Sequence, residues 1–182
     1  MSRTSRHIEP HGALQTARHY VRELVYGAND GIITTFAVVA GVAGGGLALK
    51  VVLICGAANL FADGLSMAVG NYLSIRSHES VLESEGLAQE EAFPFRHGVA
   101  TFLAFVAAGA LPLLPYALPD IGLNRFAQST IVTLLGLFGI GASRAVIANV
   151  GWWRGGLEML GLGGVVAAVA YLSGGLVARL MG

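Results

Sequence analysis

The segment from Val51 to Ile75, VVLICGAANLFADGLSMAVGNYLSI, contains one charged residue, Asp63, and is bounded by Lys50 and Arg76. A helix of about 20 apolar residues crosses the roughly 30 Å hydrocarbon layer of a bilayer, so this segment is predicted to span a membrane. Asp63 is then expected near the middle of the bilayer, where inserting an aspartate costs about 2.5 to 3.5 kcal/mol. Acids at that depth usually face a bundle interior or a water-filled path, so the position predicts a functional carboxylate.

Polar side chains recur at steps of four on both sides of Asp63, at Asn59, Met67 and Asn71. Residues four apart lie on one face of a helix, so these four residues are predicted to form one column of amide, carboxylate and thioether groups. Carboxylates attract hard cations, and a thioether adds a softer contact that Mg²⁺ and Ca²⁺ do not favour. The column therefore predicts a transition-metal site, and the alternative interpretation is a hydrogen-bonded helix pair with a protonated Asp63.

The composition places the whole chain in a membrane, because 54% of its residues are hydrophobic and only 12% are charged, against about 25% charged in soluble proteins. We predict an all-α membrane protein in which residues 13–182 form one five-helix domain and residues 1–12 a disordered tail. The uncharged runs give spans at about 24–49, 51–75, 97–119, 125–147 and 157–180, with a loop at 76–96.

Basic residues predict a cytoplasmic N-terminus for this integral membrane protein. That orientation leaves only Lys50, Arg125 and Arg179 on the outer side, in agreement with the positive-inside rule. The basic residues expected inside are Arg3, Arg6, Arg18, Arg22, Arg76, Arg96, Arg144 and Arg154. We expect a bacterial inner membrane, or a vacuole-like membrane if the source is eukaryotic.

A second polar cluster, Asn29 and Asp30, is expected at the cytoplasmic mouth of the first span. Residues 13–26 show the pattern of an amphipathic helix lying at the membrane surface. Asp30 follows, between Gly27 and Gly31, whose spacing allows another helix to approach closely. Glu23 lies seven residues before Asp30 and shares its face if the helix is continuous. Asp30 is therefore predicted to bind metal, whereas Glu23 is as well explained by contact with headgroup water.

The runs YGANDGIITTFAVVAGVAG, ANLFADGLSMAVGNYLSIRS and GVATFLAFVAAGALPLLPY resemble the vacuolar iron transporter family, and the resemblance extends over nearly the whole chain from Arg22. It implies a five-helix protein that works as a homodimer and exchanges protons for ferrous iron or similar divalent metals. It also implies an ion path between the first and second helices of the two subunits.

Carried over by position, the resemblance assigns the acidic pair of the first helix to Glu23 and Asp30, and the methionine of the second to Met67. The match is incomplete, because some members have a glutamate where this chain has Asn59, and others have one where it has Asn71. Asp63, one turn from Asn59, offers a charge on the same face, which is our inference and not a property of the family.

The loop RSHESVLESEGLAQEEAFPFR is a larger departure, because well-studied members carry a glutamate- and methionine-rich metal-collecting domain at this place. This chain retains a short acidic patch there, and His78 and His97 lie near it. We expect the patch either to collect metal at the cytoplasmic side or to be a solvated acidic loop. Its members are Glu79, Glu83, Glu85, Glu90 and Glu91.

Two features of the last three spans bear on the fold. Pro112, Pro115 and Pro119 are expected to kink or end the third span. Repeated glycines in the last two spans are typical of closely packed membrane helices, so we interpret those spans as scaffold.

The sequence favours a proton-coupled transporter that moves Fe²⁺ or Mn²⁺ out of the cytoplasm, with Co²⁺ and Zn²⁺ as further cargo. A non-transporting membrane scaffold, whose polar residues specify helix pairing, is the alternative. We expect no enzyme activity, because Ser66 and Ser74 have no intramembrane histidine to act as a base. We also expect no prosthetic group and no nucleic-acid partner; the expected partners are the bilayer, protons, divalent metal ions and a second copy of the chain.

Overall fold

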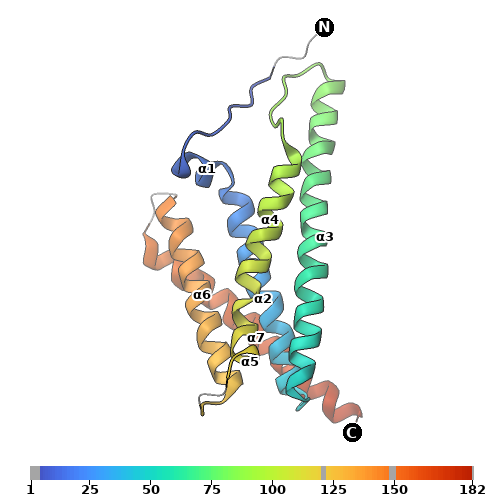
Figure 1. The fold of residues 1–182 in the computed structure, drawn as a ribbon, viewed down its shortest axis with the longest axis vertical. Helices are drawn as coiled ribbons and strands as arrows, with labels where there is room; N and C mark the ends of the chain where they lie inside the picture. The colour runs from blue at the N-terminus through green and yellow to red at the C-terminus, as the bar shows by residue number, and fades with distance from the viewer. Residues whose placement is uncertain (1–4, 120–121, 148–150, 182) are drawn as a thin grey trace.

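The computed structural model describes residues 5–119, 122–147 and 151–181, and these residues fold into a bundle of α-helices (Figure 1). A short 3-10 turn, η1, interrupts the third span. The elements are α1 (Ala13–His19), α2 (Val21–Gly44), α3 (Leu49–Ser84), α4 (Pro94–Gly109), η1 (Leu111–Leu113), α5 (Leu114–Ala117), α6 (Arg125–Ile147) and α7 (Trp152–Met181).

Within the described residues, five helical segments are long and apolar enough to cross a membrane, so the predicted all-α, five-span architecture is confirmed. The ends of the spans differ from expectation mainly in α3. It continues without a break to Ser84 and is 36 residues long, about 54 Å at the helical rise of 1.5 Å per residue. Because this exceeds the roughly 30 Å hydrocarbon layer, the polar end of α3 projects beyond the membrane, and the first part of the predicted loop 76–96 is helical.

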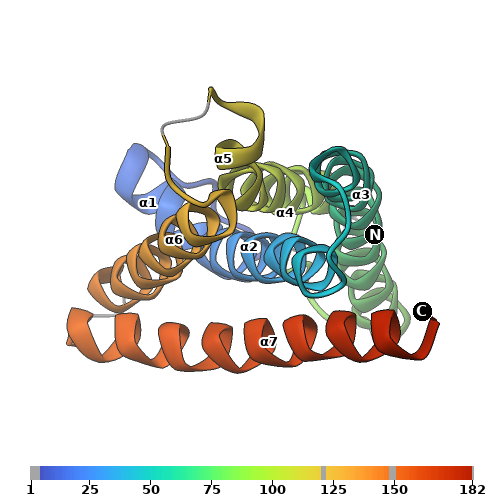
Figure 2. The same cartoon turned by 90° about the horizontal axis from the view of Figure 1, so that it is seen from below.

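The helix α2 occupies the centre of the bundle (Figure 2). It contacts α3, α4, α6 and α7, and α7 runs along one side of the bundle, against α2 and α6 (Figure 2). The buried residues of α2 include Ile32, Phe36 and Val39. The central place of α2 means that any polar residue on its surface lies next to another helix.

Glycines let α4 approach both α2 and α3. A Cβ atom at Gly27 would lie 2.6 Å from the Thr101 carbonyl oxygen of α4, and one at Gly31 would collide with the Phe105 backbone. On the opposite side, a Cβ at Gly98 of α4 would lie 2.8 Å from the Ala68 carbonyl oxygen of α3. The predicted close approach at Gly27 and Gly31 is thus confirmed, and the approaching helix belongs to the same chain.

The prolines end the third span as expected. α4 stops at Gly109, and η1 and α5 follow in a tighter path. The carbonyl groups released by this break are bonded within the chain: the Ser129 hydroxyl donates to the Pro112 carbonyl at 2.7 Å, and the Arg125 guanidinium donates to the carbonyl groups of Pro115 and Leu118. These bonds tie the start of α6 to the proline-rich segment.

The N-terminal region departs from a single amphipathic helix. α1 and α2 are separate helices that meet at Tyr20, which has φ −95° and ψ 11°. Before α1, residues 5–12 lie along the 85–93 loop, where the Arg6 N–H donates to the Gln89 carbonyl at 2.7 Å and Arg96 pairs with Glu9 at 2.9 Å. Residues 1–4 lie outside the described residues, and the disorder expected for 1–12 stays a prediction.

Candidate metal-binding sites

Asp30 of α2 and Asp63 of α3 lie on helices that contact each other. We call these two aspartates the carboxylate pair. The two helices are antiparallel and joined by a short turn, and each aspartate lies the same number of residues from that turn. The two are therefore level in the bundle, so one cannot stand at the mouth and the other at the middle of the membrane, as the sequence suggested.

The rest of the predicted column follows Asp63 along α3. Asn59, Asp63, Met67 and Asn71 are all half-buried, which places them on one face of the helix as predicted. Met67 packs at the edge of the apolar core that contains Phe105. The amide nitrogen of Asn59 is buried and makes no hydrogen bond within the described part of the chain. This orphaned nitrogen marks a place where the polar groups of α3 are not satisfied by the fold.

Two predicted ligands have other partners. The Asn71 amide donates to the Thr101 hydroxyl of α4 at 2.9 Å. Glu23 is only 2% exposed; its carboxylate lies 3.0 Å from the Arg22 guanidinium and 3.2 Å from Nδ1 of His97 at the start of α4. The structure therefore separates Glu23 and Asn71 from the carboxylate pair and attaches both to α4.

The predicted acidic patch divides into residues with different roles. Glu79 is buried near the end of α3, and its Oε1 accepts the backbone N–H groups of Glu90 at 3.0 Å and Glu91 at 2.6 Å. It therefore fixes the loop. Glu83 and Glu85 are exposed, and Glu90 faces the exposed His78 at 3.3 Å. The expectation of one mobile acidic loop does not describe Glu79 or Glu91.

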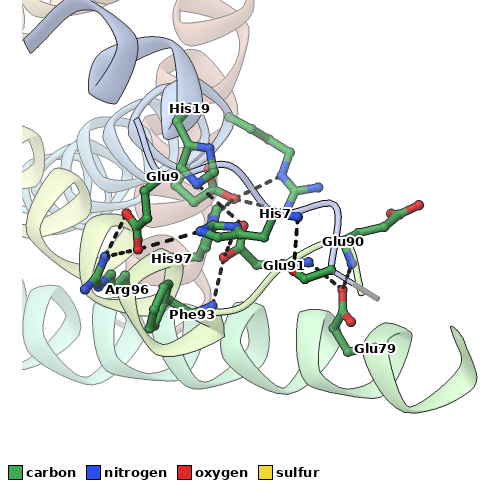
Figure 3. Close-up of polar contacts among 12 residues, drawn as sticks. His7, Glu9, His19, Glu79, Glu90, Glu91, Phe93, Arg96 and His97 are labelled. Carbon is green, nitrogen blue, oxygen red and sulfur yellow. Dashed lines mark hydrogen bonds and ion pairs between the residues drawn. The ribbon is translucent and has the colours of Figure 1, made fainter. Parts of the chain in front are cut away.

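Glu91 lies among histidines from other segments (Figure 3). Its Oε2 lies 3.0 Å from Nε2 of His97 and 3.5 Å from Nε2 of His19, and its Oε1 lies 3.3 Å from Nδ1 of His7. His19, Glu91 and His97 each offer one ligand atom, all within 4.8 Å of one another. We call these three residues the histidine cluster; it is a group of potential metal ligands that the sequence analysis did not identify.

The histidine cluster lines a cleft of about 640 Å³, whose other walls include Glu23, His78, Glu79 and Glu90. Burial raises the pKa of Glu91, but the bond from the Phe93 N–H and the approach of His97 and His7 outweigh it, so that the pKa lies below its usual range. Glu91 is therefore ionised at neutral pH and presents a negative charge to the surrounding imidazoles.

No local spacing joins the histidine cluster, because its members come from α1, the 85–93 loop and the first turn of α4. One signal was available in the sequence. All five histidines of the chain, at positions 7, 11, 19, 78 and 97, lie at or beyond the ends of spans that the five-span topology brings to one side of the membrane. The topology alone thus placed the histidines at one end of the bundle, although it could not select which of them meet.

Comparison with known proteins gives one consistent match. The sequence matches the model of the VIT family over residues 21–93 and 80–175. It is 30% identical to "Vacuolar iron transporter homolog 1" of Oryza sativa subsp. japonica over 165 residues, which cover 84% of this chain and 71% of the rice protein. It is 26% identical to "Vacuolar iron transporter 1" of Arabidopsis thaliana over 222 residues, covering 91% of this chain and 88% of the relative.

A third relative differs in length. "Vacuolar iron transporter" of Toxoplasma gondii is 25% identical over 245 residues, covering 98% of this chain and 80% of the relative. That comparison is longer than this chain, which has 182 residues, so the relative contains sequence that this chain lacks.

Proposed function

This chain belongs to the VIT family, and we propose that it is a proton-coupled transporter of divalent iron or manganese. The family and the names of its relatives support iron as cargo. Manganese, cobalt and zinc enter the proposal through ligand chemistry, because carboxylate, amide and thioether groups accept all of these ions and selectivity follows geometry and availability. Membrane transport of iron is the part of this proposal that rests on the family.

The proposed mechanism rests on one observation, the level placement of Asp30 and Asp63 on the neighbouring helices α2 and α3. The described residues provide neither of the two aspartates with an ion pair. Two like charges in a low-dielectric setting are not both ionised without a cation, so one of the two carboxyl groups holds a proton when metal is absent. A divalent cation between them reverses that preference and releases the proton.

Exchange follows from this competition if the seam opens alternately to each side of the membrane. Metal binding releases protons toward one side, and protonation on the other side releases the metal. Asn59 and Met67 lie on the same face of α3 as Asp63, so we assign them as neutral ligands that affect selectivity and carry no proton. Glu23 and Asn71, which are attached to α4, are assigned to holding the helices in place.

A second copy of the chain would complete the path. One chain offers few ligand atoms at the seam, and the column on α3 is only half-buried. A two-fold axis beside this face would double the ligands and cover it. Gly70 is exposed and lies seven residues from Asp63, on the same face of α3, and a Cβ atom there meets nothing within 4 Å. Cross-linking between copies of the chain through a cysteine placed at Gly70 would test this contact.

Orientation and direction complete the proposal. The basic residues favour a cytoplasmic N-terminus, and Arg18, Arg22 and Arg144 line one pocket, so these three lie at the same end. Metal would then leave the cytoplasm, across a vacuolar membrane as the names of the relatives suggest, or across a bacterial inner membrane. Reporter fusions at both termini test this orientation, which requires the two ends to lie on opposite sides.

An uptake assay with purified protein in lipid vesicles tests the function. Fe²⁺, Mn²⁺, Co²⁺ and Zn²⁺ are compared with and without a proton gradient. We expect the internal concentration of Fe²⁺ or Mn²⁺ to rise above the external one only when the proton gradient is present, and protein-free vesicles to remain empty. Intact, folded protein that moves none of the four metals would favour the alternative, a membrane scaffold.

A further inference from the structure

We propose that the histidine cluster, His19, Glu91 and His97, binds one divalent transition-metal ion at the N-terminal end of the bundle. This site is separate from the carboxylate pair and does not depend on the proposed transport activity. It joins the end of α1, the 85–93 loop and the first turn of α4, so a bound ion would connect three segments that are far apart in the sequence (Figure 3).

The distances suit metal ligands. Ligand atoms about 2.0 to 2.2 Å from a common ion stand roughly 3.0 to 3.5 Å apart in octahedral or tetrahedral geometry. Oε2 of Glu91 lies 3.0 Å from Nε2 of His97 and 3.5 Å from Nε2 of His19. All the ligand atoms of the cluster lie within 4.8 Å of one another.

The imidazole of His97 supplies a second, independent observation. His97 is only 6% exposed, and both of its ring nitrogens face carboxylates, Nδ1 that of Glu23 and Nε2 that of Glu91. A buried imidazole between two carboxylates is held in one orientation, with Nε2 directed into the cluster. Nε2 of His19 is likewise buried and lies 3.5 Å from the same oxygen of Glu91.

The surroundings of His97 match those of a metal-bound histidine. Nδ1 of His97 lies 3.2 Å from Oε1 of the buried Glu23, while Nε2 faces Glu91. A histidine that binds metal through one nitrogen usually has a carboxylate beside the other, which orients the ring and raises its basicity. Glu23 is therefore a positioning residue for this site, and its own charge is shared with Arg22.

The donor set selects the class of ion. Two imidazoles and one carboxylate suit Zn²⁺, Fe²⁺ and Co²⁺, whereas Mg²⁺ and Ca²⁺ prefer oxygen ligands alone. The cluster opens into a cleft of about 640 Å³, which leaves room for water to complete the coordination.

Cobalt is the probe for the test, with X-ray absorption at the Co edge as the main measurement. Purified protein in detergent is titrated with Co²⁺ at neutral pH. The carboxylate pair and the column on α3 contain no histidine, so the outer-shell scattering of imidazole excludes cobalt bound at those two places, and substitutions separate the cluster from the other histidines of the chain. We expect one cobalt ion per chain that carries two imidazoles.

Single substitutions then assign the ligands. His19→Asn and His97→Asn should each remove one imidazole and weaken cobalt binding by about tenfold or more, since even partners outside the ligand shell are worth about 10- to 100-fold. His11→Asn is the matched control, because His11 is exposed and lies outside the cluster. It should leave affinity and scattering unchanged.

Three results would overturn the proposal: parent protein that binds cobalt without imidazole scattering, parent protein that binds no cobalt at millimolar concentration, or a His11→Asn variant as defective as His97→Asn. The first two need no variant to fold. If the parent protein accumulates metal in vesicles but its cobalt carries no imidazole ligand, only this inference is contradicted. If cobalt carries two imidazoles but the protein does not transport metal, only the proposed function is contradicted.

Discussion

The two interfaces that α4 forms differ in kind from the direct contact between α2 and α3. α4 meets α2 at Gly27 and Gly31 and meets α3 at Gly64 and Gly98, with no room for a Cβ atom at three of these and little at Gly64. The α2–α3 seam instead carries two aspartates level with each other, Asp30 and Asp63. Close packing of small residues stabilises membrane helix pairs, whereas unpaired acids in a low dielectric destabilise them.

This difference suggests that the glycine interfaces of α4 and the α2–α3 seam have separate roles. α4 holds α2 and α3 at a fixed spacing, and the spacing keeps the carboxylate pair together without packing α2 tightly against α3. A site is most precise when rigid elements support it. On this account the glycine interfaces determine whether the protein folds, and the seam determines what the folded protein transports.

The largest effect is expected from Gly31→Leu. A side chain there would collide with the Phe105 backbone, and overpacking of a well-packed site costs about 1 to 3 kcal/mol or more. We expect the variant to lose its sharp gel-filtration peak after mild heating. Gly139→Leu is the control, because a Cβ at Gly139 meets nothing within 4 Å; equal loss in both variants would contradict the proposed fixed α2–α4 interface.

Asp63→Asn is expected to leave the fold intact and abolish proton-driven accumulation of metal. An amide keeps the shape of Asp63 but removes the proton-binding charge, so uptake against a gradient should fall by about tenfold or more. Ser66→Ala, an exposed change one turn away on α3, should retain uptake. Normal accumulation by Asp63→Asn would move the coupling role to Asp30.

Met67→Leu should have a smaller effect on uptake than Asp63→Asn. It removes a sulfur ligand and leaves the charges unchanged, so it separates the role of ligand type from that of charge. Leucine fills the core that Met67 contacts but has no sulfur to bind a soft cation. The half-saturating concentration of Fe²⁺ should rise, discrimination against Mn²⁺ should narrow, and uptake should stay pH-dependent. Unchanged selectivity between Fe²⁺ and Mn²⁺ would remove Met67 from the path.

The smallest effect is expected from Glu79→Ala. The Glu79 carboxylate accepts two backbone N–H groups just before α4, so its loss should expose those amides, at a local cost of about 1 to 3 kcal/mol. Hydrogen exchange at Glu90 and Glu91 should accelerate while transport persists. Glu83→Ala, which removes an exposed carboxylate, is the control. It should change neither the hydrogen-exchange rates at Glu90 and Glu91 nor the rate of transport.

The five spans could be predicted from the sequence because the length of an apolar run must match the thickness of the hydrocarbon layer. The sequence did not predict the end of α3 at Ser84, because hydropathy marks where the membrane ends and not where the helix ends. The pairing of Asp30 with Asp63 was within reach, since equal distance from the turn places them level in a hairpin. The histidine cluster was not, because His19, Glu91 and His97 come from three segments whose meeting depends on the packing of α4.

The most direct test of the central claim, that the carboxylate pair exchanges protons for metal, is simultaneous measurement of both fluxes. Vesicles containing the parent protein and a trapped pH indicator are given Fe²⁺ without an imposed gradient. We predict that internal pH rises as metal enters, because protons leave in exchange, and that Asp63→Asn removes the pH change. Metal influx in the parent with a constant internal pH, in vesicles shown to be tight to protons, would contradict the account.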